Sequence, residues 1–134
     1  LDAAGLPIPA TVDGRSVLPL LQGTVDDWRR YIHGEHCTCY HPDQEMQYVT
    51  DGKRKFIWLP RRTQEQFFDL EQDPGECNDL IDEAAHQEEI ALWRGYLMAE
   101  LAARECGWVN EGKFASRTEE PLVSPYRSQR WLGE

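Results

Sequence analysis

Short segments in which aromatic and β-branched residues alternate with polar ones dominate the middle of the chain. This pattern is typical of half-buried strands. Asp51-Gly52 separates two of the segments and favours a type I′ hairpin, because both turn positions of that type need a positive φ. The sequence therefore predicts consecutive strands joined by tight turns in an antiparallel sheet. The expected strands fall within residues 28–36, 46–50, 55–60 and 65–70.

A helical period replaces this alternation in residues 84–105. Apolar side chains recur there at spacings of three and four residues, which places them on one stripe of a helix. They are Ile90, Trp93, Leu97 and Leu101. We expect this stripe to pack on the sheet, which gives an α+β fold with a C-terminal helix.

A shorter helix is expected just before this one. Residues 73–76 read Asp-Pro-Gly-Glu, in which Asp73 suits an N-cap, the proline suits the first helical position, and Glu76 completes a capping box. These signals predict a helix that begins after Asp73 and ends near Asp82.

The two ends of the chain lack a clear strand or helix period. Residues 1–27 are interrupted by proline and glycine; they begin like the last turn of a helix that stops at Gly5, and they contain a short apolar segment that Gly23 would end. They have neither the basic nor the apolar region of a signal peptide, so we expect a connector within a longer protein. Residues 107–134 predict an extended arm. The expected organisation is therefore connector, α+β subdomain in residues 28–106, and arm.

The net charge of -10 argues against a nucleic-acid partner, because such binding depends on basic side chains that neutralise phosphates. A membrane partner is not expected either, since no apolar run approaches the ~18 residues that a membrane helix needs. The charge is unevenly distributed. Basic residues outnumber acidic ones in residues 28–62, whereas Arg94 is the one basic residue of the acidic region 65–100. The basic region is thus the part suited to face an anion.

Histidines and cysteines gather in residues 31–41, YIHGEHCTCYH. Imidazole and thiolate are good zinc ligands, and Cys37 and Cys39 would point the same way on an extended chain. Structural zinc sites usually bring two ligand pairs from separate segments, however, and Cys77 and Cys106 each stand alone. The metal-binding alternative would use His33, His36, Cys37, Cys39 and His41.

The same segment allows two other interpretations. Cys37 or Cys39 beside a histidine has the residue types of a thiolate nucleophile and its base, but no motif supplies an orienting partner or an oxyanion site. A strand that continues through His36 would place His33 and His36 on opposite faces, which weakens a shared metal site. The simplest interpretation is a polar strand end whose histidines contact a ligand.

For the other charged side chains, the simplest interpretation is structural: they lie on a solvated turn or on a solvated helix face. Lys53 and Lys55 in the expected hairpin become candidates to face an anion if neighbouring arginines converge on them. Asp79 and Glu83 would repel each other at helical spacing unless a cation lay between them, and we assign them no catalytic role.

Several motifs follow one another in a recognisable order. They are Asp13-Gly14-Arg15-Ser16, Thr50-Asp51-Gly52, Lys55, Phe68-Asp69-Leu70-Glu71, Asp73-Pro74, Glu76 and Leu80. In this order they resemble the C-terminal subdomain of type I sulfatases, the arylsulfatase-like members of the alkaline phosphatase superfamily, together with the segment that links it to the catalytic domain. The resemblance covers about residues 5–105.

This resemblance implies a small four-stranded antiparallel sheet with a packed C-terminal helix, docked on a large α/β catalytic domain. In that family a Cys or Ser in a C/S-x-P-x-R motif becomes formylglycine, whose hydrate attacks sulfur, and carboxylates of the catalytic domain hold a calcium ion. The nearest approach here is residues 123–127, VSPYR, with valine where Cys or Ser is needed. We therefore expect formylglycine and calcium in a catalytic domain outside this chain, and no activity from the chain alone.

The resemblance also implies that the subdomain closes one side of the substrate cleft. His33 and His36 are then the candidates for the pocket wall, and packing against the catalytic domain is the alternative role for them. The expected function is substrate recognition and domain packing in a hydrolase of sulfate esters, with a sulfated carbohydrate or an aryl sulfate as substrate. A stand-alone module that binds anionic glycans and a small metal-binding protein are the alternatives. A docking face left exposed would favour a homodimer.

Overall fold

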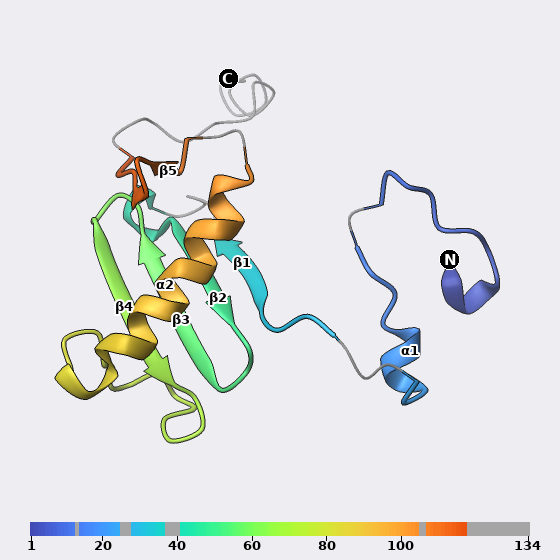
Figure 1. Ribbon diagram of the computed structural model, residues 1–134, viewed down its shortest axis with the longest axis horizontal. Coiled ribbons are helices and arrows are strands. Elements are labelled where there is room, and N and C mark those ends of the chain that lie inside the picture. Colours follow the sequence, from blue (N-terminus) through green and yellow to red (C-terminus); the bar gives the residue numbers. More distant parts are fainter. Residues whose placement is uncertain (13, 25–27, 37–40, 105–106, 118–134) are drawn as a thin grey trace, which may run out of the picture. The chain divides into compact units, whose positions relative to one another are not determined.

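A computed structural model describes residues 1–12, 14–24, 28–36, 41–104 and 107–117. The chain divides into two compact units, residues 1–30 and residues 31–134, and each is described by itself. The larger unit contains the sheet and the long helix (Figure 1).

The larger unit is built on a four-stranded antiparallel sheet with the order β1-β2-β3-β4, which confirms the predicted fold class (Figure 1). Each strand pairs with its neighbour in the chain, so short turns suffice between β2 and β3 and between β3 and β4. The strands are β1 (Ile32–His36), β2 (Met46–Thr50), β3 (Arg54–Leu59) and β4 (Gln64–Asp69), with a 3-10 turn (Pro42–Gln44) before β2.

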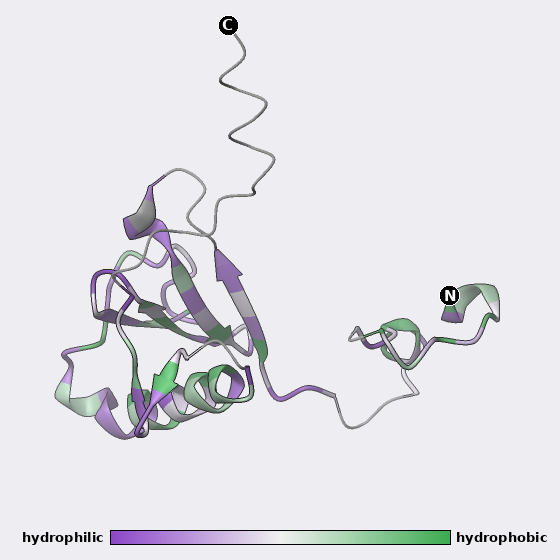
Figure 2. Ribbon diagram, turned by 90° about the horizontal axis from the view of Figure 1, so that it is seen from above, coloured by the Kyte–Doolittle hydropathy of each residue, from purple (hydrophilic) through white to green (hydrophobic). Residues whose placement is uncertain are grey.

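Helix α2 (Gln87–Ala102) packs along one face of this sheet (Figure 1). Apolar and polar residues alternate around its coil, as the hydropathy colours show (Figure 2). The predicted stripe is buried, with Ile90, Leu97 and Leu101 at 0% exposure and Trp93 at 5%. The stripe forms one core with the sheet residues whose side chains face α2. These are Val49, Phe56, Trp58 and Phe67. The prediction of a helix packed through this stripe is confirmed.

The other face of the sheet has a smaller apolar cluster. Its buried members are Ile57, Leu59 and Phe68, and Met46, Tyr48 and Leu70 pack against them. Because successive side chains of a strand point to opposite faces, these residues alternate along the strands with those that face α2.

The β2–β3 hairpin forms as expected, but its turn is of another kind. Gly52 has a φ of 87°, whereas Asp51 has no positive φ, so the prediction of a type I′ turn is wrong. Asp51 Oδ1 instead accepts hydrogen bonds from the N–H groups of Lys53 and Arg54, both at 2.8 Å. The carboxylate satisfies these donors in an Asx-type turn, which needs only one left-handed residue.

The short helix predicted for residues 73–82 is also wrong, because this segment is a series of turns after β4. Glu76 has a left-handed φ of 53°, which a helix does not allow. Asp79 Oδ1 accepts a hydrogen bond from Phe67 N–H of β4 at 3.0 Å, and Leu80 N–H donates to the Phe67 carbonyl at 2.8 Å. The exposed edge of the sheet therefore competes with helical hydrogen bonding for this loop.

A small hairpin occupies the start of the predicted arm. Glu111 and Gly112 form its turn with φ values of 49° and 72°, the left-handed pair that a type I′ turn needs. Trp108, just before the hairpin, is 6% exposed and belongs to the core under α2. The strands are β5 (Val109–Asn110) and β6 (Lys113–Phe114). The rest of the predicted arm, residues 118–134, lies outside the described residues.

The smaller unit has little regular structure. The expected helical turn is a 3-10 helix (Asp2–Ala4) closed by Gly5 with a φ of 67°, and the apolar segment forms α1 (Leu18–Leu21) before Gly23, whose φ is 64°. Both glycine stops are confirmed. Within the described residues, no helix has the length and apolar character needed to cross a membrane.

Candidate functional site

The two histidines predicted for a pocket wall lie on opposite faces of β1. His33 is paired with Val49, on the face that α2 covers, whereas His36 is paired with Met46, on the other face. A strand that runs through both positions requires this arrangement. The structure therefore does not bring the two histidines together, and each has its own set of neighbours.

His33 belongs to a closed ring of hydrogen bonds with Glu35, Gln47 and Arg104. Arg104 follows α2 and donates to His33 Nδ1 at 3.0 Å and to Glu35 Oε2 at 2.9 Å. Gln47 is only 2% exposed; it donates to Glu35 Oε2 at 3.4 Å and contacts His33 Nε2 through Oε1 at 2.9 Å. Because arginine can only donate, His33 accepts at Nδ1 and donates from Nε2 to the amide oxygen. The four side chains serve as hydrogen-bond partners for one another, which favours a structural role for His33.

His36 lines an open hollow of about 450 Å³ on the sheet face opposite α2. Its Nδ1 donates to the Gln44 carbonyl at 3.2 Å, since a carbonyl can only accept. Besides His36, the lining consists of Asp43, Gln44, Met46, Leu59, Arg62 and Gln66. We call this space the His36 hollow. Two apolar side chains, Met46 and Leu59, lie among these polar groups, so the hollow offers both kinds of contact that small organic molecules use.

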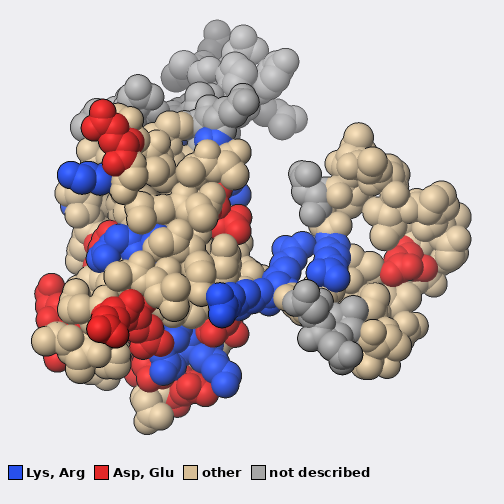
Figure 3. Space-filling view, viewed as in Figure 1, with Lys and Arg blue, Asp and Glu red and all other residues tan. Residues whose placement is uncertain are grey.

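Arg62 contributes the positive charge of the His36 hollow. It lies in the β3–β4 turn, where its backbone N–H donates to the Leu59 carbonyl at 3.1 Å. Within the described part of the chain, its guanidinium group forms no ion pair, although Asp43 also lines the hollow. The other described arginines of the larger unit each pair with a carboxylate: Arg54, Arg61, Arg94, Arg104 and Arg117. On the outer surface seen from the α2 side, Lys and Arg also lie next to Asp and Glu (Figure 3).

The two lysines predicted to face an anion are paired with carboxylates. Lys55 Nζ lies 2.8 Å from both carboxylate oxygens of Glu76, and Lys53 Nζ lies 3.4 Å from Glu71 Oε1. An anion at this position would have to displace a carboxylate that is already there. The anion-facing role of these lysines stays a prediction, and the contacts favour a structural role.

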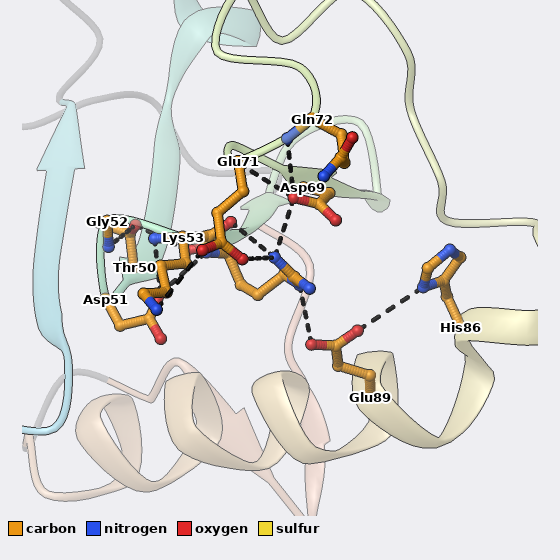
Figure 4. Close-up of polar contacts among 10 residues, drawn as sticks. Thr50, Asp51, Gly52, Lys53, Asp69, Glu71, Gln72, His86 and Glu89 are labelled. Atoms are coloured by element: carbon orange, nitrogen blue, oxygen red, sulfur yellow. Dashed lines mark hydrogen bonds and ion pairs between the residues drawn. The ribbon is translucent and has the colours of Figure 1, made fainter.

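Arg54, between these lysines in the chain, is the centre of a polar cluster that joins β4 to α2. Figure 4 shows the three carboxylates of this cluster, Asp69, Glu71 and Glu89. Its guanidinium group donates to Asp69 at 2.9 Å, to Glu71 at 3.2 Å and to Glu89 at 2.9 Å. Burial opposes the charge of Arg54, but the negative charges of Glu89 and Asp69 and the hydrogen bonds outweigh it and raise the pKa of the guanidinium group. Arg54 therefore stays protonated and ties the start of α2 to the sheet.

The metal-binding and nucleophile alternatives depend on Cys37 and Cys39, which lie outside the described residues. Of the proposed histidine ligands, His41 lies 3.5 Å from an oxygen of Asp43, whereas the other two are on opposite faces of β1. Among the residues that the structure describes, no three His, Cys, Asp or Glu side chains are arranged to hold a metal ion, calcium included. Both alternatives stay predictions.

Sequence reasoning missed Gln47, Arg104 and Arg62. For Gln47 a signal existed, because it shares the core-facing side of β2 with Val49, and a buried amide needs polar partners. Arg104 gave no such signal, since it meets Glu35 across 69 positions of the chain. In the sequence, Arg62 was one of several basic residues in its region. Only the fold shows that the other described arginines of the larger unit have carboxylate partners and that Arg62 lines the hollow.

Sequence comparison places the chain among known proteins. The sequence model of the family described as "N-sulphoglucosamine sulphohydrolase, C-terminal" matches residues 1–102. An arylsulfatase of Clostridium perfringens (strain 13 / Type A) is 39% identical over 113 residues, which are 84% of this chain and 23% of the relative. The sequence relationship is thus with the C-terminal part of sulfatases.

Solved structures have the same fold. A 2-O GAG sulfatase matches 93% of this chain with a TM-score of 0.71 and 21% identity, and a putative sulfatase from Bacteroides thetaiotaomicron matches 93% with a TM-score of 0.69 and 22% identity. This chain spans 26% of each of them. Because the family match covers residues 1–102 and a relative is 39% identical over 84% of this chain, the chain belongs to the alkaline phosphatase-like sulfatase family and forms the C-terminal domain of a sulfatase.

Proposed function

We propose that this domain supplies one wall of the substrate pocket of a sulfate-ester hydrolase, and that the wall is the His36 hollow. The observation behind the proposal is that Arg62 and the anchored imidazole of His36 line the same hollow as two apolar side chains. Within the described residues, Arg62 has no ion pair. Arginine suits sulfate oxygens because its planar donors bind oxyanions in pairs. Met46 and Leu59 suit the organic group of the ester.

Two classes of substrate fit such a wall. The family description names N-sulphoglucosamine and one structural neighbour is a GAG sulfatase, which supports a sulfated carbohydrate; the curated relative is an arylsulfatase, which supports an aryl sulfate. Sulfate-ester hydrolysis needs a nucleophile, a divalent cation and an acid for the leaving group. We assign the formylglycine and the calcium ion to a catalytic domain that precedes this one in a longer sulfatase.

Packing against that catalytic domain is the second part of the proposed function. The smaller unit exposes apolar side chains that a folded protein normally covers, among them Leu21 at 80% and Leu1 at 61%. We infer that the catalytic domain covers them. The isolated chain would cover them by self-association, which is the homodimer expected from the sequence.

The His36 hollow is tested in the longer sulfatase with His36→Gln and Arg62→Gln. Each change removes a polar or charged contact to the substrate, so we expect KM to rise about tenfold with a smaller change in kcat. Steady-state kinetics on an aryl sulfate and on a sulfated glucosamine measure this and show which class depends on the wall.

His86→Gln is the matched control, because His86 lies at the start of α2 and contacts Glu89 at 3.6 Å, outside the hollow. It should leave KM unchanged. A KM equal to that of the wild type for both His36→Gln and Arg62→Gln would contradict the proposed wall.

The isolated 134-residue chain is expected to hydrolyse neither an aryl sulfate nor a sulfated glucosamine above the buffer rate. The reason is that the sequence lacks the C/S-x-P-x-R motif that supplies the nucleophile in type I sulfatases, since residues 123–127 have valine at its first position. Release of the phenol or of sulfate, followed over hours at high protein concentration, measures this. Turnover that co-purifies with the chain through two columns would show that the chain has its own catalytic site.

A further inference from the structure

We infer that Glu45 is the positioning residue of the His36 hollow. This inference rests on the proposed function only for its effect on substrate; the arrangement itself is visible in the contacts of Glu45. Glu45 lies directly before β2 and is 8% exposed. A carboxylate so deeply buried needs charged partners, and it has two.

The first partner comes from the β3–β4 turn. Arg61 Nε donates to Glu45 Oε2 at 2.9 Å, and both side chains are 11% exposed, which makes this the most buried ion pair among the described residues. Shielding from water strengthens such a pair relative to a surface pair. It fixes the distance between the start of β2 and the turn after β3.

The second partner comes from the chain after β6. Arg117 NH1 lies 3.5 Å from Glu45 Oε1, and the same guanidinium lies 4.2 Å from the ring centre of Trp108. The backbone N–H of Arg117 also donates to the Pro60 carbonyl at 3.2 Å. The segment that sequence analysis expected to be an arm is therefore fastened to the turn that contains Arg61.

These contacts matter for the hollow because its lining residues are the direct neighbours of the ion-paired ones. Gln44 and Met46 flank Glu45, and Arg62 follows Arg61. The Gln44 carbonyl in turn anchors the ring of His36. One carboxylate thus sets the spacing between the imidazole side and the guanidinium side of the hollow.

Removal of the negative charge of Glu45 should displace one particular part of the fold, the β3–β4 turn. Without the carboxylate, the guanidinium groups of Arg61 and Arg117 would face each other next to Arg62, and like charges at this spacing repel. The β3–β4 turn should then move away from β2. The ion-paired cluster touches the core under α2 through the ring of Trp108, over which Arg117 lies, whereas the fully buried stripe residues of α2 should stay packed.

The test uses the 134-residue chain with Glu45→Gln, which keeps the size of the side chain and removes its charge. Amide hydrogen exchange is followed at three reporters, the N–H groups of Gln44, Arg62 and Arg117, whose acceptors are the carbonyls of His41, Leu59 and Pro60. We expect exchange at these reporters to accelerate about tenfold, the equivalent of one charge-assisted hydrogen bond, with unchanged exchange in the centre of α2.

Glu76→Gln is the matched control. It also removes one carboxylate from a close ion pair, with Lys55, but near the other end of β3. It should leave the three reporters unchanged. Equal acceleration in both variants, or none in Glu45→Gln, would overturn the inference whatever the substrate of the sulfatase.

Kinetics in the longer sulfatase then separate this inference from the proposed function. We expect Glu45→Gln to raise KM severalfold with little change in kcat, and to do so at temperatures where the variant is fully folded. If His36→Gln and Arg62→Gln raise KM and Glu45→Gln does not, the positioning role is refuted and the proposed wall stands. If all three leave KM unchanged, the proposed wall fails, and hydrogen exchange alone decides whether Glu45 holds the hollow.

Discussion

Replacing Leu97 with alanine is expected to lower the free energy of unfolding by about 2–5 kcal/mol, the range for a fully buried leucine whose cavity closes only in part. Leu97 is 0% exposed and lies in the centre of α2, where it contacts the core formed by the sheet. A single small core has little else to replace the lost contacts. Urea unfolding followed by tryptophan fluorescence measures the change.

Leu92→Ala is the control for this prediction, because it makes the same chemical change in the same helix at a side chain that is 52% exposed. Its effect should stay within about 0.5 kcal/mol, as for most surface substitutions. If Leu92→Ala destabilises the protein as much as Leu97→Ala, the stripe has been assigned to the wrong face of the helix.

Replacing Gly34 with alanine is expected to destabilise the fold by about 1–3 kcal/mol, as overpacking of a filled site does. The reason is space rather than backbone conformation. A Cβ on Gly34 would lie 2.2 Å from Cζ and 2.3 Å from the hydroxyl oxygen of Tyr48, far inside van der Waals contact. The tyrosine ring would have to rotate out of the cluster that it forms with Ile57 and Phe68.

A double-mutant cycle isolates this contact. In a Tyr48→Ala background the added methyl group meets no ring, so Gly34→Ala should then change the free energy of unfolding by less than about 0.5 kcal/mol. The coupling energy between the two positions should therefore account for most of the effect of Gly34→Ala alone. A coupling near zero would mean that Tyr48 does not lie across β1 in solution.

Sequence reasoning succeeded where structure depends on neighbours along the chain. The strand segments, the glycine stops and the stripe of α2 follow from alternation, turn residues and a 3.6-residue period, and each was found where expected. The helix at residues 73–82 failed although its local signals were good. Asp79 and Leu80 of that segment bond to Phe67 of β4, and a sheet edge is a competitor that no local signal reveals.

The candidate site shows the same division. The segment around His33 and His36 was recognised from its composition, and their opposite faces follow from strand geometry. The different environments of the two histidines do not follow from strand geometry. Arg104 contacts His33 from 71 positions away in the chain, and Arg62 lies in the same hollow as His36 only because the strands pair. Lys53 and Lys55 looked equally basic in sequence, yet they face Glu71 and Glu76.

The amino-acid sequence by itself determined that this chain is an α+β C-terminal domain of a sulfatase, because hydrophobic period and the order of local motifs are properties of adjacent residues. Only the tertiary structure decided which charged groups are neutralised and which are left facing a hollow. Partner choice among charged side chains depends on distances of a few ångströms and on shielding from water. Both quantities arise when distant segments pack, so Glu45, Arg61 and Arg62 acquired their different roles through the fold.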